Sequence, residues 1–226
     1  MDALLLSLRL AGCVSVILFC IGVPLAYWLA FSRWRGKFFL EAVVALPLVL
    51  PPTVLGFYLL IAMGPRGSLG KLWQTLFGHA LAFTFAGLIV ASILYSLPFA
   101  VQPLIASFES IDRKLLDASA VLGAGKLRTF LRVILPLSLP GVITALVLSF
   151  AHTLGEFGVV LMVGGNLPGV TRTVSIDIYD RVQSLEYADA NRMALLLLFI
   201  SFAVLSVVYG MNRHWGRRTW SPWPAK

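Results

Sequence analysis

Long runs without a charged side chain divide this sequence of 226 residues into apolar segments. Five such runs are 20 to 37 residues long: Leu10–Ser32, Ala42–Pro65, Leu72–Phe108, Val133–Gly155 and Met193–Asn212. A helix needs about 20 apolar residues to cross the hydrocarbon core of a membrane. We therefore predict five membrane-spanning helices, near residues 8–31, 40–63, 79–101, 137–162 and 191–211.

The composition supports an all-α, polytopic membrane helix bundle. Hydrophobic residues make up 59% of the chain and charged residues only 12%, against about 25% charged residues in soluble domains. The runs do not alternate between apolar and polar residues, as the strands of a membrane β-barrel do. Helices then satisfy the backbone in lipid. We predict a single transmembrane domain over residues 1–226.

The first apolar run does not have the form of a cleaved signal peptide. It opens with Asp2 rather than with a basic cluster, it is too long, and no A-x-A site follows it. We therefore expect it to remain as a membrane helix.

Basic residues are unevenly distributed between the predicted loops. If the first span runs from outside to inside, residues 32–41, 102–136 and the C-terminal tail face the cytoplasm. These segments carry 12 of the 18 lysines and arginines, and the opposite face carries six. Because cytoplasmic loops are enriched in basic residues, we predict an outer N-terminus and a cytoplasmic C-terminus. Arg213, Arg217 and Arg218 in the tail are suited to anionic lipid headgroups, so the net charge of +8 does not indicate nucleic acid.

Residues that carry catalysis or bind metals are sparse. The three histidines, His79, His152 and His214, have no ligand spacing around them. Cys13 and Cys20 lie seven residues apart in the first run, too far apart to bridge, and we expect buried apolar thiols. We therefore predict that the chain is not an enzyme and has no metal site.

One segment, Gly64–Leu72, resembles a phosphate-binding loop. Its spacing is one residue too long, and Leu72 stands where a Ser or Thr binds magnesium. We interpret the segment as a Gly/Pro-rich turn. The chain is therefore expected to bind no nucleotide or other cofactor of its own.

The predicted cytoplasmic segment 102–136 contains two short helices. Ser110 or Asp112 is suited to cap the first helix. Its apolar stripe consists of Ile111, Leu115, Ala118 and Leu122. Gly123 follows the stripe, where a helix end favours a left-handed residue, and a second helix begins near Lys126. The segment is larger than a connection needs, and it is either an amphipathic helix on the lipid headgroups or a docking element for a soluble partner.

The spacing within this segment resembles the cytoplasmic loop of the membrane subunits of bacterial ABC importers. That loop has the form E-A-A-x3-G-x9-I-x-L-P, and this chain has Asp117-Ala118-Ser119, Gly123 and Val133-x-Leu135-Pro136 in the same register. The resemblance implies a coupling helix that inserts into a partner ATPase. The docking residues that it implies are Asp117, Ala118, Ser119, Gly123, Ala124, Gly125, Leu135 and Pro136.

Further motifs resemble those of the molybdate permease subunits among these importers. The motifs are Leu46–Pro52 followed by Gly56, Ala62–Gly70, Leu154–Gly158 and Gly165–Thr173. The resemblance implies a homodimer in the bacterial inner membrane, two copies of an ABC ATPase that binds ATP and magnesium, and a periplasmic oxyanion-binding protein. Molybdate is the implied substrate, with tungstate as a close substitute. Sulfate and thiosulfate permease subunits share the L-G-E-[FY]-G and G-N-[IL]-P motifs and are the nearest alternative.

An anion path would need polar groups within the spans. Pro47, Pro51 and Pro52 break the second span near its cytoplasmic half, and the helix N-termini at such breaks, Pro51 and Pro52 above all, can hold an anion. The prolines otherwise act as packing kinks. Ser149 and Thr153 are the hydroxyl-bearing residues that we expect along the path.

Glu156 is the one acid in the interior of a predicted span, since Glu41 lies at the very start of the second, and intramembrane acids are usually functional or paired. Because a bare carboxylate repels an anion, we predict a structural role for Glu156. The expected partners are His152, one helical turn away, or backbone N–H groups near Gly155 and Gly158.

The predicted outer loop, residues 164–190, is the surface available to a binding protein. Thr171, Arg172 and Thr173 are the candidate contact residues, and a solvated loop is the alternative. An ion-driven secondary transporter is a further alternative for the chain, but it would need a coupling residue such as Glu156, and we find no internal repeats. A channel would not need the two-helix cytoplasmic loop.

Overall fold

The computed structural model describes the backbone of residues 2–219 and the side chains of residues 2–210. Within this range the chain is helical and has no strand. The helices are α1 (Asp2–Phe31), α2 (Lys37–Val49), α3 (Pro52–Met63), α4 (Ser68–Phe77), α5 (Phe85–Glu109), α6 (Arg113–Val121), α7 (Lys126–Thr129), α8 (Leu135–Leu137), α9 (Leu139–Gly155), α10 (Gly158–Gly164), α11 (Val174–Gln183) and α12 (Tyr187–Thr219). A π-helical segment, Phe130–Ile134, joins α7 to α8.

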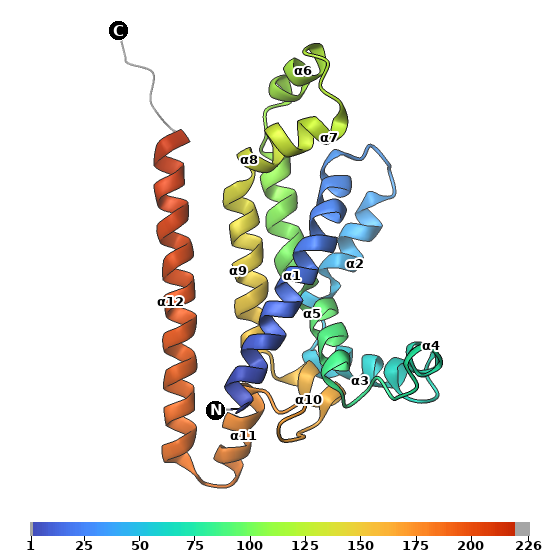
Figure 1. The fold of residues 1–226 in the computed structure, drawn as a ribbon, viewed down its shortest axis with the longest axis vertical. Helices are drawn as coiled ribbons and strands as arrows, with labels where there is room; N and C mark the ends of the chain where they lie inside the picture. Colours follow the sequence, from blue (N-terminus) through green and yellow to red (C-terminus); the bar gives the residue numbers. More distant parts are fainter. Residues whose placement is uncertain (1, 220–226) are drawn as a thin grey trace.

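Helices α1, α5 and α9 pack together and form the centre of the bundle (Figure 1). Apolar side chains from the three helices make up the core at one end, and they include Ala26, Leu29, Val101, Leu104, Phe108, Val142 and Ala145. Tyr27 of α1 adds edge-to-face contacts with Phe108 and Phe130. Because Val142 and Ala145 belong to this core, the first part of α9 is held against α1 and α5.

The expected number of spans is compatible with the structure. Three helices are long and apolar enough to cross a membrane: α1, α5 and the part of α12 from Tyr187 to Gly210. The second and fourth predicted spans are bent instead, by 112° between α2 and α3 and by 73° between Lys126–Leu137 and α9. Each bent pair counted as one span makes five.

The third span differs from its prediction at both ends. Helix α5 begins at Phe85 rather than near residue 79, because the Thr84 hydroxyl accepts a hydrogen bond from the Gly87 N–H at 3.1 Å and caps the helix. It continues to Glu109, through Pro98 and Pro103. The segment between the third and fourth spans therefore begins at Ser110 and not at residue 102.

The second span is interrupted at Leu50–Pro51, as expected from Pro51 and Pro52, but α2 continues through Pro47, where a break was also expected. The fourth span, which bends before α9, is interrupted again at Glu156–Phe157, and the sequence did not predict this break. The outer parts beyond these breaks, α3 and α10, pack against each other. A Cβ atom at Gly56 would lie 2.8 Å from the Met162 Cβ, and one at Gly158 would lie 2.7 Å from the Pro52 Cβ. The two glycines therefore permit the close packing.

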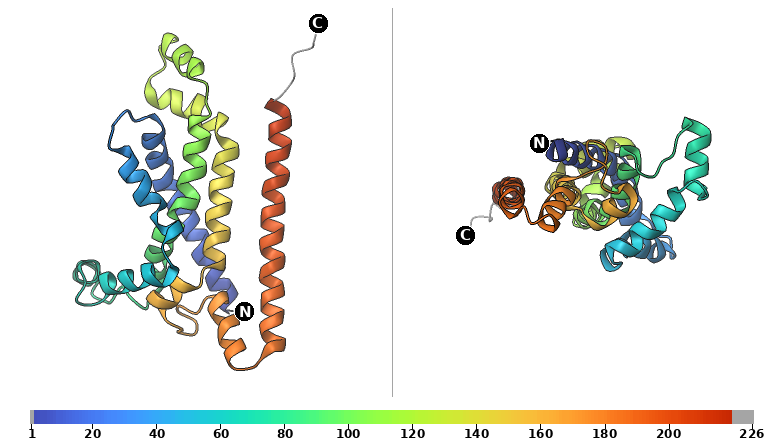
Figure 2. Two further views of the ribbon diagram at one scale, coloured as in Figure 1. Left: turned by 180° about the vertical axis from the view of Figure 1, so that it is seen from behind. Right: turned by 90° about the horizontal axis from the view of Figure 1, so that it is seen from below.

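Residues 64–67 form the turn expected from the Gly/Pro-rich segment, but a helix that was not expected follows it. This helix, α4, extends away from the bundle together with α3 (Figure 2). It ends at Gly78, which has a φ of +76°.

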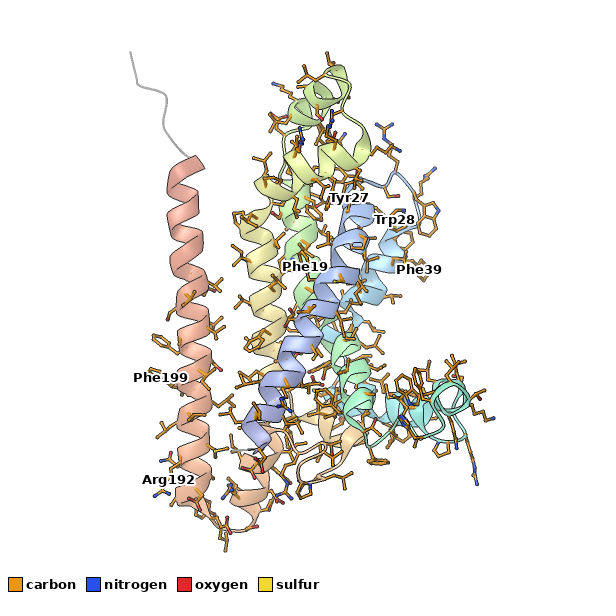
Figure 3. All side chains as sticks on the ribbon, viewed as in Figure 1. Phe19, Tyr27, Trp28, Phe39, Arg192 and Phe199 are labelled. Atoms are coloured by element: carbon orange, nitrogen blue, oxygen red, sulfur yellow. The ribbon has the colours of Figure 1, made fainter. Side chains whose placement is uncertain are left out.

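Helix α12 runs along the side of the bundle, and its apolar side chains face outwards. In the most apolar stretch of Tyr187–Gly210 only 6% of the residues are buried. Figure 3 shows Phe199 pointing away from the neighbouring helices. The two thiols, Cys13 and Cys20, are exposed on α1. The expectation of buried thiols was wrong, because they lie on the face of α1 that is turned away from the packed helices. The side chains of Arg213, Arg217 and Arg218 lie outside the described residues.

The N-terminus of α1 lies at the end of the bundle opposite to α6 and α7 (Figure 1). Helix α12 returns the chain to the end where α6 and α7 lie. If each bent pair is counted as one crossing, α6 and α7 lie on the same side as the end of α12, which is compatible with the topology prediction.

Gly56→Leu tests the contact between α3 and α10. We expect it to lower the free energy of unfolding by about 1–3 kcal/mol, because overpacking forces helices apart. The matched control is Gly12→Leu, since no atom lies within 4 Å of a Cβ at Gly12. Thermal unfolding of the purified protein in detergent would measure both changes, and equal melting temperatures for the two variants would contradict the packing.

Candidate functional site

The segment from Asp112 to Pro136 is an ordered pair of helices. The Asp112 carboxylate accepts a hydrogen bond from the Lys114 N–H at 2.9 Å, which confirms the expected cap of α6. Helix α6 ends in two hydrogen bonds, from the Gly123 N–H to the Ala120 carbonyl at 2.9 Å and from the Ala124 N–H to the Ser119 carbonyl at 3.0 Å. This is the Schellman pattern. Gly123 has a φ of +74°, as the sequence predicts.

Helices α6 and α7 are braced against each other. The hydroxyl groups of Ser119 and Thr129 are 2.6 Å apart and share a hydrogen bond. Ser119 is buried, so it holds the bend rather than offering an exposed contact to a partner. Ala124 and Leu135 are half-buried, and the other implied docking residues, Asp117, Ala118, Gly123, Gly125 and Pro136, are exposed.

The outer surface of this helix pair is strongly apolar. Val121 is 88% exposed, Leu122 is 86% exposed and Leu127 is 71% exposed. Of the predicted apolar stripe only Ile111 is buried. A groove of about 360 Å³ between α6 and the following turns is lined by Leu115, Ala118, Ser119, Leu122, Ala124, Arg128, Arg132 and Val133. The sequence predicted the two helices and the position of Gly123, but it did not predict the exposed apolar tip formed by Val121, Leu122 and Leu127.

The helix break at Pro51 and Pro52 offers few backbone N–H groups that could bind an anion. Pro51 precedes α3 and Pro52 is its first residue. Neither proline has an N–H group, so Thr53 carries the first N–H of this helix. Both prolines are exposed, and the break itself is the feature that the sequence predicts.

Ser149 and Thr153 do not lie open to a path on this subunit. The Ser149 hydroxyl donates to the Ala145 carbonyl at 2.8 Å, within its own helix. Thr153 shares a hydrogen bond of 2.9 Å with Ser96 of α5. Both side chains are buried, so their hydroxyls join α9 to itself and to α5. The sequence pattern alone did not distinguish this inner face from an exposed one.

Glu156 ends α9 and is buried, 4% exposed. The expected partner His152 is engaged elsewhere: its Nδ1 is 2.9 Å from the Ser96 hydroxyl, and its ring stacks on Phe99 at 3.9 Å. The nearby hydroxyl is that of Ser92 on α5. The carboxyl oxygens of Glu156 and the Ser92 hydroxyl make no hydrogen bond within the described residues. The predicted pairing was therefore wrong.

The candidate outer contact residues are mostly internal. Thr171 and Thr173 are buried. The Thr171 hydroxyl donates to the Gly164 carbonyl at 2.6 Å and so closes the loop that follows α10. Arg172 is partly exposed, and it pairs with Asp180 at 3.4 Å. Of the three candidates, only Arg172 is accessible to a partner.

Charged side chains connect α11 to the start of α12. Arg181 pairs with Asp177 at 3.0 Å, with Glu186 at 3.4 Å and with Asp189 at 3.6 Å. The hydrogen bond from Arg181 to Asp177, together with the charge of Asp177, raises the pKa of Arg181. The pairs link α11 to the start of α12 and leave this surface mixed in charge.

Within the described residues, no three His, Cys, Asp or Glu side chains converge as metal ligands. The geometry thus offers two features of functional interest. One is the rigid, apolar helix pair at one end, and the other is the joint between two broken spans.

Comparison with known proteins gives a match over most of the chain. The family model described as "Binding-protein-dependent transport system inner membrane component" matches residues 22–221. A "Molybdenum transport system permease protein ModB" of Azotobacter vinelandii is 54% identical, over 93% of both chains. The Escherichia coli (strain K12) protein of the same description is 37% identical, over 92% of this chain and 90% of its own. A Chlorella vulgaris protein described as a "Probable sulfate transport system permease protein" is 32% identical, over 92% of this chain and 77% of its own.

Solved structures share the fold at low sequence identity. A bacterial ABC transporter involved in the import of alginate superposes with a TM-score of 0.77 at 18% identity, over 94% of this chain and 78% of that one. The MetNI methionine ABC transporter superposes with a TM-score of 0.71, over 94% of both chains. The chain is therefore a permease subunit that belongs to the family of inner membrane components of binding-protein-dependent transport systems.

Proposed function

We propose that this chain is the permease subunit of an ATP-driven importer of molybdate, with tungstate as a close substitute. The observation that carries the proposal is the 54% identity to a molybdenum transport permease over 93% of both chains. The relative described as a sulfate permease is less similar, at 32% identity.

The helix pair α6–α7 is the proposed docking element for a cytoplasmic ABC ATPase. Three features support this role: the bend is fixed by the Ser119–Thr129 hydrogen bond, Gly123 closes α6, and an apolar tip is exposed at Val121, Leu122 and Leu127. A rigid element with an apolar end fits into a cleft at low entropic cost. ATP and magnesium would bind to the ATPase and not to this chain.

The proposed assembly contains two copies of this chain, two copies of the ATPase and a periplasmic oxyanion-binding protein. Large apolar side chains are exposed on α3, on α12 and on the outer face of α1. Such surfaces suit lipid or a second copy of the chain. In a structural relative, the bacterial alginate transporter is in complex with a periplasmic protein, and here Arg172 is the candidate contact for such a protein.

The proposed orientation places the N-terminus outside and α6–α7 in the cytoplasm. We expect a cysteine at Ser184, in a variant without Cys13 and Cys20, to react with an impermeant thiol reagent in intact cells. A cysteine at Lys126 should react only after lysis. Both residues are exposed, and the reverse pattern would overturn the orientation and the docking role with it.

Gly123→Val tests the docking element. A β-branched residue at positive φ is unfavourable by on the order of 1–2 kcal/mol, so co-purification of the ATPase should fall about 5- to 30-fold. Gly123→Asn is the matched control at the same position, because a Cβ at Gly123 meets no atom within 4 Å among the described residues and asparagine adopts a positive φ far more readily than valine. Normal ATPase association in Gly123→Val would argue against a role for the bend.

A deletion strain tests the substrate. At scarce molybdate we expect the strain to lose accumulation of molybdenum, and a high external concentration to restore it, while sulfate uptake stays normal. Cellular molybdenum and labelled sulfate are the quantities to measure. Normal molybdenum with impaired sulfate uptake would assign the chain to the sulfate group and would leave its family unchanged.

A further inference from the structure

Glu156 occupies a position that its ionised form does not suit. The chain has two buried acids among the described residues, Glu156 and Asp177. Asp177 pairs with Arg181 at 3.0 Å. Among the described residues Glu156 has no ion pair, and its carboxyl oxygens make no hydrogen bond of good geometry, although the Ser92 hydroxyl lies beside them. An orphaned buried polar group of this kind calls for a bound species or a change of protonation.

Glu156 lies between two helix ends. It directly follows the last turn of α9, whose carbonyl groups carry partial negative charge, and it lies two residues before the start of α10, whose N–H groups carry partial positive charge. The two helix ends oppose each other at this position, so the burial of the unpaired carboxyl decides which form is favoured.

Within the part of the chain whose side chains are described, no basic residue pairs with the carboxyl group of Glu156. Helices α3 and α10 contain no charged residue. On α5 the titratable neighbour is Tyr95, and on α9 it is His152, which is held by Ser96 and Phe99.

The remaining charged groups lie in the first turns of α1, on and just before α11, and at the start of α12. On α11 and at the start of α12 the charges pair with one another through Arg172, Arg181 and Arg192. On α1 the charged residues are Asp2 and Arg9, in its first turns. Arg9 lines a separate cavity with Asp2, Phe85 and Val170.

A metal ion would need more ligands than this position offers. One carboxyl group and the Ser92 hydroxyl converge, and no cluster of three ligand side chains exists among the described residues. A proton needs only the carboxyl. Burial of an unpaired ionised carboxylate is far more costly than burial of the neutral acid, and the neutral acid gains an O–H donor for a neighbouring hydroxyl oxygen.

We propose that Glu156 is a proton-binding site within the membrane and that it exists as a neutral carboxylic acid, hydrogen-bonded to Ser92. The site lies at the joint where the break in the fourth span meets the break in the second, since Gly158 packs against Pro52. A neutral acid would join the break between α9 and α10 to α5 without placing a negative charge inside the subunit. The inference is independent of which oxyanion is transported.

Infrared spectroscopy of the full chain in lipid nanodiscs at pH 7 tests the site. The carbonyl stretch of a protonated carboxylic acid should be present, and Glu156→Gln should remove it. Glu41→Gln is the control and should leave the band intact, because Glu41 is partly exposed and pairs with Lys37 at 3.5 Å. Absence of the band in the unaltered protein, or its persistence in Glu156→Gln, would overturn the proposal.

A second pair of variants tests the hydrogen bond. Ser92→Ala should shift the frequency of the band, because the acid loses its partner. Ser149→Ala is the matched control, since Ser149 is also buried but bonds within its own helix, two turns from Glu156. The proposed partner would be wrong if Ser92→Ala left the band unmoved, or if both variants moved it equally.

Discussion

Lipid offers no hydrogen-bond partner to the backbone, and the organisation of this chain depends on that constraint. Two spans are broken, at Leu50–Pro51 and at Glu156–Phe157, and a broken helix is tolerated at membrane depth only where protein or an aqueous cavity surrounds it. Here the break in the fourth span packs against Pro52, because Gly56 and Gly158 let α3 and α10 approach closely, while the break in the second span stays exposed on this subunit. The continuous helices α1, α5 and α9 provide the support against which this pair rests.

Helix α9 connects the proposed docking helices, α6 and α7, to the joint between the two broken spans at Glu156. Its first residues follow the π-helical segment and a bend of 73° from the coupling-loop helices. Its last residue precedes Glu156 and the joint with α3. Hydrogen bonds between Ser96 of α5 and both Thr153 and His152 hold the distant end of α9. A displacement of α6–α7 by an ATPase would therefore reach the joint through one rigid helix.

The sequence predicts features that depend on local chemistry. The five apolar runs, the break at Pro51, the cap at Asp112 and the left-handed Gly123 each follow from residues close together in the chain. Features that depend on contacts between distant residues were missed. The hydroxyls of Ser149 and Thr153 look alike in sequence whether they face a path or a neighbouring helix, and only the packing of α5 on α9 shows that both are internal. The burial of Thr171 and the engagement of His152 by Ser96 have the same origin.

We propose that a partner ATPase drives oxyanion transport through this chain, and uptake by reconstituted vesicles would measure this. Vesicles would contain the permease and its cognate ATPase, with ATP inside, and the loaded binding protein and labelled molybdate outside. The account predicts accumulation of molybdate that requires ATP hydrolysis and that disappears when the ATPase is omitted. Accumulation driven by an ion gradient without the ATPase would contradict it.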